Sequence, residues 1–280
     1  MYNPSIEQLA GLANEAISNG DFESGAMFLN EIAKRDIQIL RGNPITYANI
    51  LACGGFWSTM TRLLPFGTNS LVEIGWINSL VKRAPVNAID EPLPWYTYPA
   101  IDFLEPRVKS HWNVFEWGCG NSSLWWSKRV HSVCSVEHDK DWFQVIYKQR
   151  QRNGRLSLVT DERDYVDAIS SHSQESGHLF DVIVIDGEWR NACARRAPDY
   201  LSNDGIIVFD NTDRVMFEDG SNFLTNAGFM RIDFTGLIPS YLYRNCTSVF
   251  FKNTGIISAI PHPASQITCL GPTCAQAMGE

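Results

Sequence analysis

The first part of the chain shows a helical spacing of apolar positions. Between residues 5 and 40, apolar side chains recur at helical intervals, and an Asn-Gly-Asp break at 19–21 divides them into two amphipathic helices. Helical character continues over 41–92, interrupted by glycine and proline, and ends in the proline-rich stretch 84–99. The pattern therefore predicts a small helical N-terminal domain over residues 1–92.

A different pattern, in which short apolar runs alternate with helical segments, begins at residue 93. Strands are predicted at 112–117, 131–136, 155–159, 181–185 and 206–209, the last after a sharp turn at 203–205, with helices at 122–130, 139–152, 164–171 and 190–201. The strands are apolar almost throughout, which is typical of a parallel sheet covered on both faces. Two later runs, 228–234 and 246–251, predict an antiparallel hairpin at one sheet edge. The predicted fold class is α/β, with a doubly wound, mostly parallel sheet and a C-terminal hairpin over 93–252, followed by a tail, 253–280, that we expect to pack loosely.

Composition narrows the classes of function. The net charge of −8 disfavours a protein that wraps nucleic-acid phosphates, because that mode needs basic surface stripes. The sequence has no apolar run near about 18 residues and no basic-then-apolar start, so we expect no membrane partner and a cytoplasmic location. The 7 cysteines are an odd number without the density of a disulfide scaffold, which favours reduced thiols. Nothing in the pattern predicts the oligomeric state.

The loop after the first predicted strand carries the strongest chemical signal. In "VFEWGCGNSS", residues 114–123, a strand ending near Glu116 runs into Gly118 and Gly120 before a helix. These glycines permit a tight turn and let a ligand approach the main chain, as in loops that cradle nucleotides, although a plain strand-to-helix turn is the simpler alternative. A dinucleotide loop would have a third glycine where this chain has Ser123, and the charge of Glu116 would lie close to the pyrophosphate. The loop therefore favours a ligand with a cationic end over a nicotinamide dinucleotide.

A second acidic residue, Glu137, ends the second predicted strand. The carboxyl ends of the first two strands are neighbours in an open α/β sheet. Glu137 can therefore accept hydrogen bonds from the hydroxyls of a ribose held over the glycine loop, the alternative being an ordinary surface glutamate. Together with Glu116 and the glycines, it describes a nucleoside that carries an ammonium rather than a phosphate. S-adenosylmethionine fits that description.

Five separated segments carry a resemblance to one enzyme family: "PWYTYPAIDFLE", "VFEWGCGNSSLWWSKRV", "VCSVEHDKDWF", "DVIVIDGEWRNAC" and "GIIVFDNTDR". In this order they look like the class I S-adenosylmethionine-dependent methyltransferases, in particular a subgroup whose substrates are mostly unassigned. The resemblance implies a Rossmann-like fold over roughly 94–252. It also implies cofactor-binding roles for Glu116, Gly118, Gly120 and Ser122 around the methionine part, Glu137 at the ribose, His138, Thr160 and Asp161 near the adenine, and Asp186. Ser122 stands where the commonest family motif has its third glycine.

Three polar residues follow the fourth and fifth predicted strands. Asp186 ends the fourth, and Asp210 and Asn211 end the fifth, in the region where doubly wound sheets bind ligands. Their order also resembles the metal-dependent catechol and caffeoyl-CoA O-methyltransferases, which implies a Mg²⁺ ion held by Asp186, Asp210 and Asn211. In the metal-free alternative, Asp210 or Asp186 is the general base, and Asp210 with Asn211 caps the loop. Of the two, we favour the metal-free form.

The loops beyond these strands are expected to line the acceptor side of the site. Arg190 and Arg214 would bind an anionic acceptor there, or serve as surface and ion-pair residues. The aromatic residues at 95–98 precede the first strand and are expected to cover the pocket. The tryptophan pair at 125–126 falls within a helix and is expected in the core.

The leading interpretation is a methyltransferase that acts on an oxygen or nitrogen of a small-molecule acceptor, with Asp186 and Asp210 as catalytic residues. One alternative is a nicotinamide-dependent oxidoreductase, which Ser123 and Glu116 disfavour. Another is a catalytically silent module that binds the cofactor or a partner, although such a module has no physical need for carboxylates at four strand ends. The acceptor is left open among sugars, polyketides, peptides and small phenols, because fold does not fix it.

Overall fold

The computed structural model describes residues 4–19, 21–35 and 70–258. Its contacts divide the chain into two units between Ser70 and Leu71. The expected boundary at residue 92 differs from this division, because the segment from 71 to 92 packs with the sheet, where Trp76 is part of the hydrophobic core. The helical segments expected within 36–69 and the tail beyond residue 258 lie outside the described residues.

The first unit contains the predicted pair of amphipathic helices, α1 (Ile6–Ser18) and α2 (Phe22–Arg35). Their facing sides bury Leu9, Ala13 and Ile32, which recur at the spacing that predicted the helices. At the start of α1, the side chains at positions 5 and 8 form a capping box, with bonds of 2.8 and 3.2 Å to each other's backbone nitrogens.

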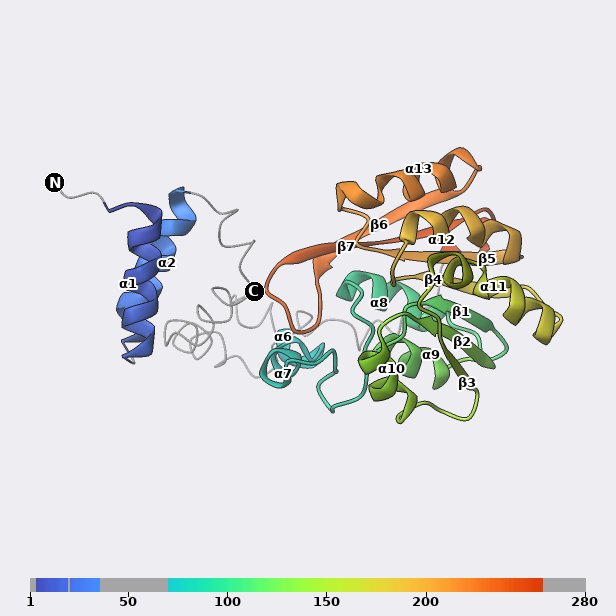
Figure 1. Cartoon of the computed structure of the whole chain (residues 1–280), viewed down its shortest axis with the longest axis horizontal. Coiled ribbons are helices and arrows are strands. Elements are labelled where there is room, and N and C mark those ends of the chain that lie inside the picture. Colours follow the sequence, from blue (N-terminus) through green and yellow to red (C-terminus); the bar gives the residue numbers. More distant parts are fainter. Residues whose placement is uncertain (1–3, 20, 36–69, 259–280) are drawn as a thin grey trace, which may run out of the picture. The chain divides into compact units, whose positions relative to one another are not determined.

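The second unit is built on a seven-stranded sheet of order β3-β2-β1-β4-β5-β7-β6 (Figure 1). Its strands are β1 (Asn113–Trp117), β2 (Ser132–Glu137), β3 (Gly154–Leu158), β4 (Phe180–Ile185), β5 (Leu201–Asp210), β6 (Met230–Leu237) and β7 (Arg244–Phe251). Strands β1 to β5 run parallel, whereas β7 lies antiparallel between β5 and β6. This confirms the predicted Rossmann-like α/β fold with an antiparallel hairpin at one edge. The chain runs outwards from β1 to β3 and then crosses to β4, so the carboxyl ends of β1 and β4 form the switch point.

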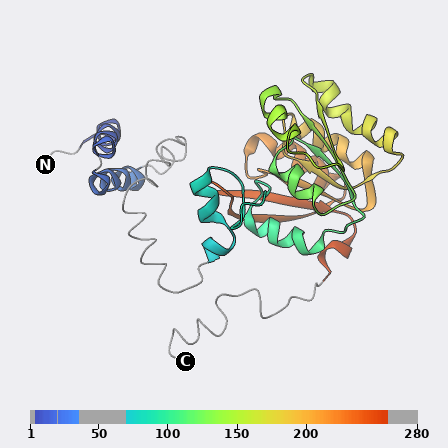
Figure 2. The ribbon, with the colours of Figure 1, turned by 90° about the horizontal axis from the view of Figure 1, so that it is seen from below.

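Helices cover both faces of this sheet (Figures 1 and 2). The helices of the second unit are α6 (Ser70–Glu73), α7 (Trp76–Lys82), α8 (Tyr98–Leu104), α9 (Asn121–Ser127), α10 (Lys140–Tyr147), α11 (Glu162–Ser176), α12 (Arg190–Arg196) and α13 (Glu218–Asn226). Alternate strand residues face opposite cores, so that Val114 packs towards α7, α8 and α9 and its neighbour Phe115 towards α11, α12 and α13. No helix in the described ranges is both long enough and apolar enough to span a membrane.

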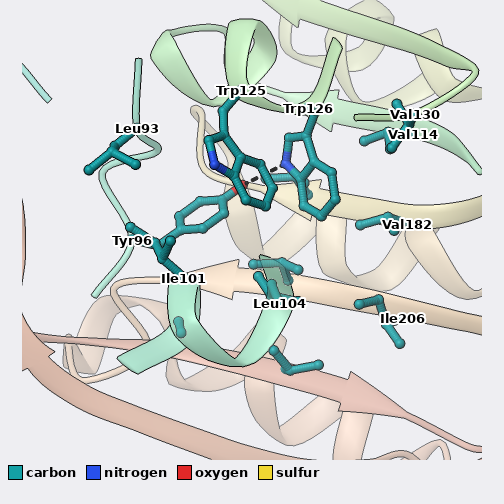
Figure 3. Packing of buried hydrophobic residues seen from close by; sticks show 14 of the residues in the cluster. Leu93, Tyr96, Ile101, Leu104, Val114, Trp125, Trp126, Val130, Val182 and Ile206 are labelled. Atoms are coloured by element: carbon teal, nitrogen blue, oxygen red, sulfur yellow. Dashed lines mark hydrogen bonds between the residues drawn. The ribbon is translucent and has the colours of Figure 1, made fainter. Parts of the chain in front are cut away.

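One core holds the tryptophan pair of α9 (Figure 3). Trp125 and Trp126 are fully buried, and the indole nitrogen of Trp126 donates to the hydroxyl of Tyr96 at 3.4 Å. The expectation that this pair belongs to the core is confirmed. Tyr96 and Tyr98 are also buried in this core rather than placed over the pocket.

The helix predicted over 190–201 contains Pro198, at which a kink or split is expected. The helix expected to reach residue 201 ends at Arg196, and a 3₁₀ turn, Ala197–Tyr200, follows with Pro198 near its start. Proline lacks the N–H that a continuing α-helix needs, which explains the early end.

The sharp turn expected at 203–205 lies within β5, which begins at Leu201. A Cβ at Gly205 would lie 2.8 Å from the Leu201 side chain and 3.0 Å from Ser202 O, so the chain folds back on itself there. Pairing with β4 jumps there from Leu201 opposite Phe180 to Ile206 opposite Val182. The Asn-Asp-Gly sequence therefore forms an irregularity inside the strand, where the extra residues bulge out of register.

Candidate active site

A cavity of about 420 Å³ opens at the carboxyl ends of β1, β2, β4 and β5. Its wall takes in the loops after these four strands, the connection between β6 and β7, and the segment before α8. The residues of the predicted site that line it are Gly118, Gly120, Ser122, Glu137, His138, Asp186, Asp210 and Asn211. The switch point of the sheet therefore gathers most of the predicted site in one place.

The two glycines of the loop after β1 have different roles. Gly118 has a φ of +89°, and a Cβ there would lie 2.8 Å from the backbone nitrogen of Gly187. This glycine lets the loops after β1 and β4 approach each other closely. Gly120 has an extended backbone, and a Cβ there would meet its nearest atoms, on Ser122 and Trp142, at 3.8 Å. Because Gly120 lines the cavity, its missing side chain leaves room for a ligand.

Glu116 lies beneath this loop and is not part of the cavity wall. Its side chain is fully buried, and Oε2 accepts hydrogen bonds from the hydroxyls of Ser123 and, at 3.0 Å, Ser135. Ser123 Oγ in turn accepts the backbone N–H of Gly120 at 3.1 Å, whereas Glu116 Oε1 has no hydrogen-bond partner in the described chain. Burial raises the pKa of Glu116 to about 8. An added hydrogen-bond donor, such as an ammonium, would stabilise this unpartnered oxygen.

Glu137 ends β2 and lines the cavity beside the glycine loop. Its carboxylate accepts three backbone N–H groups, from Cys119 at 3.0 Å and from His138 and Asp139 at 2.8 Å each. These bonds join the ends of β1 and β2 and fix the carboxylate in the wall. A carboxylate has about four acceptor positions, so Oε2, which accepts one of the three bonds, can still accept a ligand hydroxyl.

The three residues predicted near an adenine separate into two places. His138 lines the cavity, with its Nδ1 at 3.0 Å from Glu137 Oε1 and its Nε2 at 3.8 Å from Glu188 Oε1. Thr160 and Asp161 are not part of the cavity wall. Asp161 is the N-cap of α11, where its carboxylate accepts two backbone N–H groups of the first turn. Of the three, His138 is the one that faces the cavity.

An arginine joins the ends of β4 and β5. Its Nε donates to the carbonyl of Gly187 at 2.8 Å, and Nη1 donates to the carbonyl of Asp210 at 2.8 Å and to Asn211 Oδ1 at 2.9 Å. Its Nη2 donates to the carbonyl of Asp186 at 2.9 Å and forms an ion pair with Asp186 Oδ1 at 3.0 Å. All three nitrogens of Arg190 are therefore committed to the protein, which leaves the guanidinium without a face for an anionic acceptor.

The carboxylate of Asp210, at the end of β5, is held by three side-chain donors. Its Oδ1 accepts the hydroxyl of Thr247 at 2.5 Å, and its Oδ2 accepts the side-chain amides of Asn211 at 2.7 Å and Asn245 at 3.4 Å. Burial and the neighbouring charge of Asp186 raise the pKa of Asp210 to about 8. A cavity-lining carboxyl with a pKa near neutrality has the property required of a general base.

The residues predicted as alternative Mg²⁺ ligands do not fit that ion. Asp186 Oδ1 and Asn211 Oδ1 both face the guanidinium of Arg190, at 3.0 and 2.9 Å. A divalent cation bridging these oxygens would have to displace a positive charge that the fold already holds there. Within the described ranges, no group of three His, Cys, Asp or Glu residues is arranged to hold a metal ion. The donor set supports the metal-free alternative.

Sequence analysis missed most of one side of the cavity. Trp142 of α10 stacks on Trp95 with ring centroids 6.4 Å apart, and Trp95 lies 6.2 Å from Tyr241, which lies 5.0 Å from Tyr243. We call these four residues the aromatic row; all of them line the cavity, and Trp95 alone was expected there. The two tyrosines stand two positions apart just before β7, and this spacing was the signal that could have pointed to them.

No protein family model and no curated relative matches the chain. Among solved structures, it is similar to a precorrin-6y C5,15-methyltransferase from Geobacter metallireducens, at 14% identity and a TM-score of 0.44, over 55% of this chain and 87% of that one. It is also similar to a spermidine synthase from Thermotoga maritima, at 15% identity and a TM-score of 0.43, over 54% of this chain and 57% of that one. A third similar structure is the N-methyltransferase NodS from Bradyrhizobium japonicum, at 15% identity and a TM-score of 0.37, over 53% of this chain and 91% of that one. The likeness at these values concerns the fold, and the function has to be argued from the site.

Proposed function

We propose that this chain is a class I S-adenosylmethionine-dependent methyltransferase that acts on an oxygen or nitrogen of a small-molecule acceptor. The observation that carries the proposal is the junction of Glu137 with the glycine loop, made by the N–H of Cys119 at 3.0 Å. This junction sets an available carboxylate oxygen and an open stretch of main chain on one cavity wall, at the switch point of a doubly wound sheet. A ribose and its attached chain are the ligand parts that need those two features.

The surroundings favour a cationic nucleoside. Glu116 Oε1 is buried without a donor, and Gly120 leaves the cavity open where a Cβ would stand. We propose that Ser122 and the open main chain at Gly120 receive the methionine part, with Glu116 supporting this loop from beneath through Ser123, and that Glu137 receives the ribose hydroxyls and His138 the adenine side. S-adenosylmethionine, when bound, supplies an electrophilic methyl group on a positively charged sulfur. A dinucleotide loop would have its third glycine at Ser123, whose hydroxyl here donates to Glu116, and this argues against the oxidoreductase alternative.

The acceptor side of the proposal rests on Asp210. A hydroxyl or amine that gains a methyl group must lose a proton, and Asp210 is the cavity carboxyl whose pKa of about 8 allows it to take that proton near neutral pH. Arg190 acts as a positioning residue, because its bonds to Asp186 and Asn211 fix both side chains beside Asp210. We expect the reaction to need no Mg²⁺. The described cysteines are unpaired, which fits the reducing cytoplasm that we propose as its location.

The deciding experiment is calorimetry on the full chain with S-adenosylhomocysteine and, separately, with NAD and NADP. We expect S-adenosylhomocysteine to bind and both dinucleotides to give no heat. Glu137→Gln should weaken binding, whereas Glu175→Gln, which changes an exposed glutamate of α11 paired with Arg155, should not. Binding of NAD in place of S-adenosylhomocysteine would refute the proposal. S-adenosylhomocysteine binding without methyl transfer to any acceptor would favour the catalytically silent alternative.

A further inference from the structure

The aromatic row runs from the glycine loop, where the indole nitrogen of Trp142 donates to the carbonyl of Cys119 at 2.6 Å, to the β6–β7 connection, and it lines this side of the cavity with ring faces. Four rings from three distant segments follow one another at centroid distances of 5.0 to 6.4 Å, and Ile238 adds a further apolar side chain to the same wall. The backbone carbonyl of Tyr241 accepts the indole N–H of Trp76 at 3.0 Å, so the row is fixed from behind. Such a row binds planar or flat-faced ligands by stacking.

Three polar side chains beside the row, Asp210, Asn211 and Asn245, are hydrogen-bonded to one another. Both oxygens of Asp210 accept hydrogen bonds, the amide of Asn211 donates to Asp210 and accepts from Arg190, and Asn245 also donates to Asp210. These three side chains leave a ligand few free hydrogen-bonding positions, whereas the aromatic row offers it ring faces. An acceptor with one or two polar groups on a planar ring matches the wall better.

Arg214 is the exception in this wall. It lines the cavity from the loop after β5, and its guanidinium forms no hydrogen bond or ion pair with any described residue. Its charge nevertheless acts on the site: burial raises the pKa of Asp186 and that of Tyr243, and the nearby Arg214 charge opposes part of each rise. Arg214 is therefore close to both Asp186 and the aromatic row, and its guanidinium is available to a ligand.

We propose that the acceptor is an aromatic carboxylic acid, whose ring stacks on the aromatic row and whose carboxylate pairs with Arg214. This deepens the proposed function, on which it rests. A planar guanidinium pairs with a carboxylate through two parallel hydrogen bonds. A phosphate would bring a second negative charge towards Asp186 and Glu188, which line the same cavity with one uncommitted arginine to balance it. Arg214 is thus the specificity-determining residue for the acceptor charge.

The test measures binding to the full chain saturated with S-adenosylhomocysteine, by calorimetry. The probes are 4-hydroxybenzoate and 4-hydroxycinnamate, their uncharged amides, and glucuronate as a non-aromatic acid. We expect both aromatic acids to bind at least about ten-fold more tightly than their amides, in keeping with the strength of a charge-assisted pair, and glucuronate not to bind. Arg214→Gln should remove the preference for acids and leave the affinity for S-adenosylhomocysteine unchanged.

The matched control is Arg152→Gln, because Arg152 is an exposed arginine outside this cavity, and this variant should keep the preference. Amides that bind as tightly as acids, a preference that survives Arg214→Gln, tighter binding of glucuronate, or no binding of either aromatic acid would each overturn the inference. Each of these outcomes leaves the proposed function standing as long as S-adenosylhomocysteine binds. Failure of S-adenosylhomocysteine itself to bind would instead refute the proposed function.

Discussion

Alanine at Gly118 and alanine at Gly120 should separate the role of the glycine loop in folding from its role in binding. At Gly118, the added Cβ would lie 2.8 Å from Gly187 N and 2.9 Å from the carbonyl carbon of Asp186, on a backbone with a φ of +89°. At Gly120, the added Cβ would lie 3.8 Å from its nearest neighbours, on an extended backbone. The same methyl group, moved by two residues, therefore meets rigid backbone in one case and open cavity in the other.

The cost at Gly118 has two parts. A left-handed backbone costs a residue with a side chain about 1–2 kcal/mol, and displacing the neighbouring backbone adds about 1–3 kcal/mol, the usual cost of overpacking. We expect the free energy of unfolding to fall by about 2–5 kcal/mol, which lowers the Tm by about 4–20 °C for a unit of this size. At Gly120, alanine restricts the unfolded chain without straining the fold, so the free energy of unfolding should change by less than about 1 kcal/mol.

Thermal unfolding followed by circular dichroism measures the first effect, and calorimetry with S-adenosylhomocysteine measures the second. Gly120→Ala should keep its Tm but bind about ten-fold more weakly, since the new carbon overpacks the ligand site. Gly118→Ala should lose stability even without ligand. A Gly118→Ala protein as stable as the parent, or a Gly120→Ala protein with unchanged affinity, would refute the roles assigned to the two glycines.

Three further results are expected. The folded-state pKa of Glu116, about 8, lies above its ordinary value of 4.5, so the folded protein binds an extra proton between these two pH values. In the absence of cofactor, its free energy of unfolding should therefore fall as pH rises from 4.5 to 8. Urea titrations across this range should show a flatter profile for Glu116→Gln. Arg190→Ala leaves Asp186 without its partner and should lower the free energy of unfolding by about 3 kcal/mol in urea titrations, with partial recovery in Arg190→Lys. EDTA should leave methyl transfer by the parent protein unchanged. Loss of activity with EDTA and its recovery with Mg²⁺ would contradict the metal-free assignment. Glu137→Ala should weaken S-adenosylhomocysteine binding by about 1.5–3 kcal/mol in calorimetry, and an unchanged affinity would show that Glu137 is not the ribose ligand.

The strands and their parallel arrangement follow from the sequence, because each strand is a short apolar run and runs that are apolar on both faces belong to a covered parallel sheet. The start of β5 at Leu201 does not follow, because Asn203 to Gly205 have the composition of a turn. Leu201 already pairs with Phe180, and pairing resumes at Ile206, opposite Val182 of β4 and Phe251 of β7. The early pair depends on β4, which the local sequence does not contain.

The site divides in the same way. Glu137, Asp186 and Asp210 could be placed from sequence, since each ends or directly follows a strand and the carboxyl ends of parallel strands meet at one edge. The full commitment of Arg190 could not, because its partners come from the ends of two different strands. The aromatic row depends on even more distant segments, and apart from the spacing of Tyr241 and Tyr243 its residues carry no local feature that separates them from core aromatics.

Helix α7 bears on how the acceptor preference of this protein could be changed. Its Trp76 donates to the carbonyl of Tyr241 at 3.0 Å, and its Ser79 hydroxyl accepts the backbone N–H of Ser240 at 2.8 Å. The β6–β7 connection is thus fastened to a helix that shares no residue with the glycine loop or with the turn after β2. Randomising α7 together with residues 238–243 in a mutant library should change which acceptors are chosen while every member keeps the same nucleoside. Conversely, a chain trimmed to begin at β1 would lose α7, Trp95 and the buried side chains of α8, and so would expose the face of the sheet that they cover.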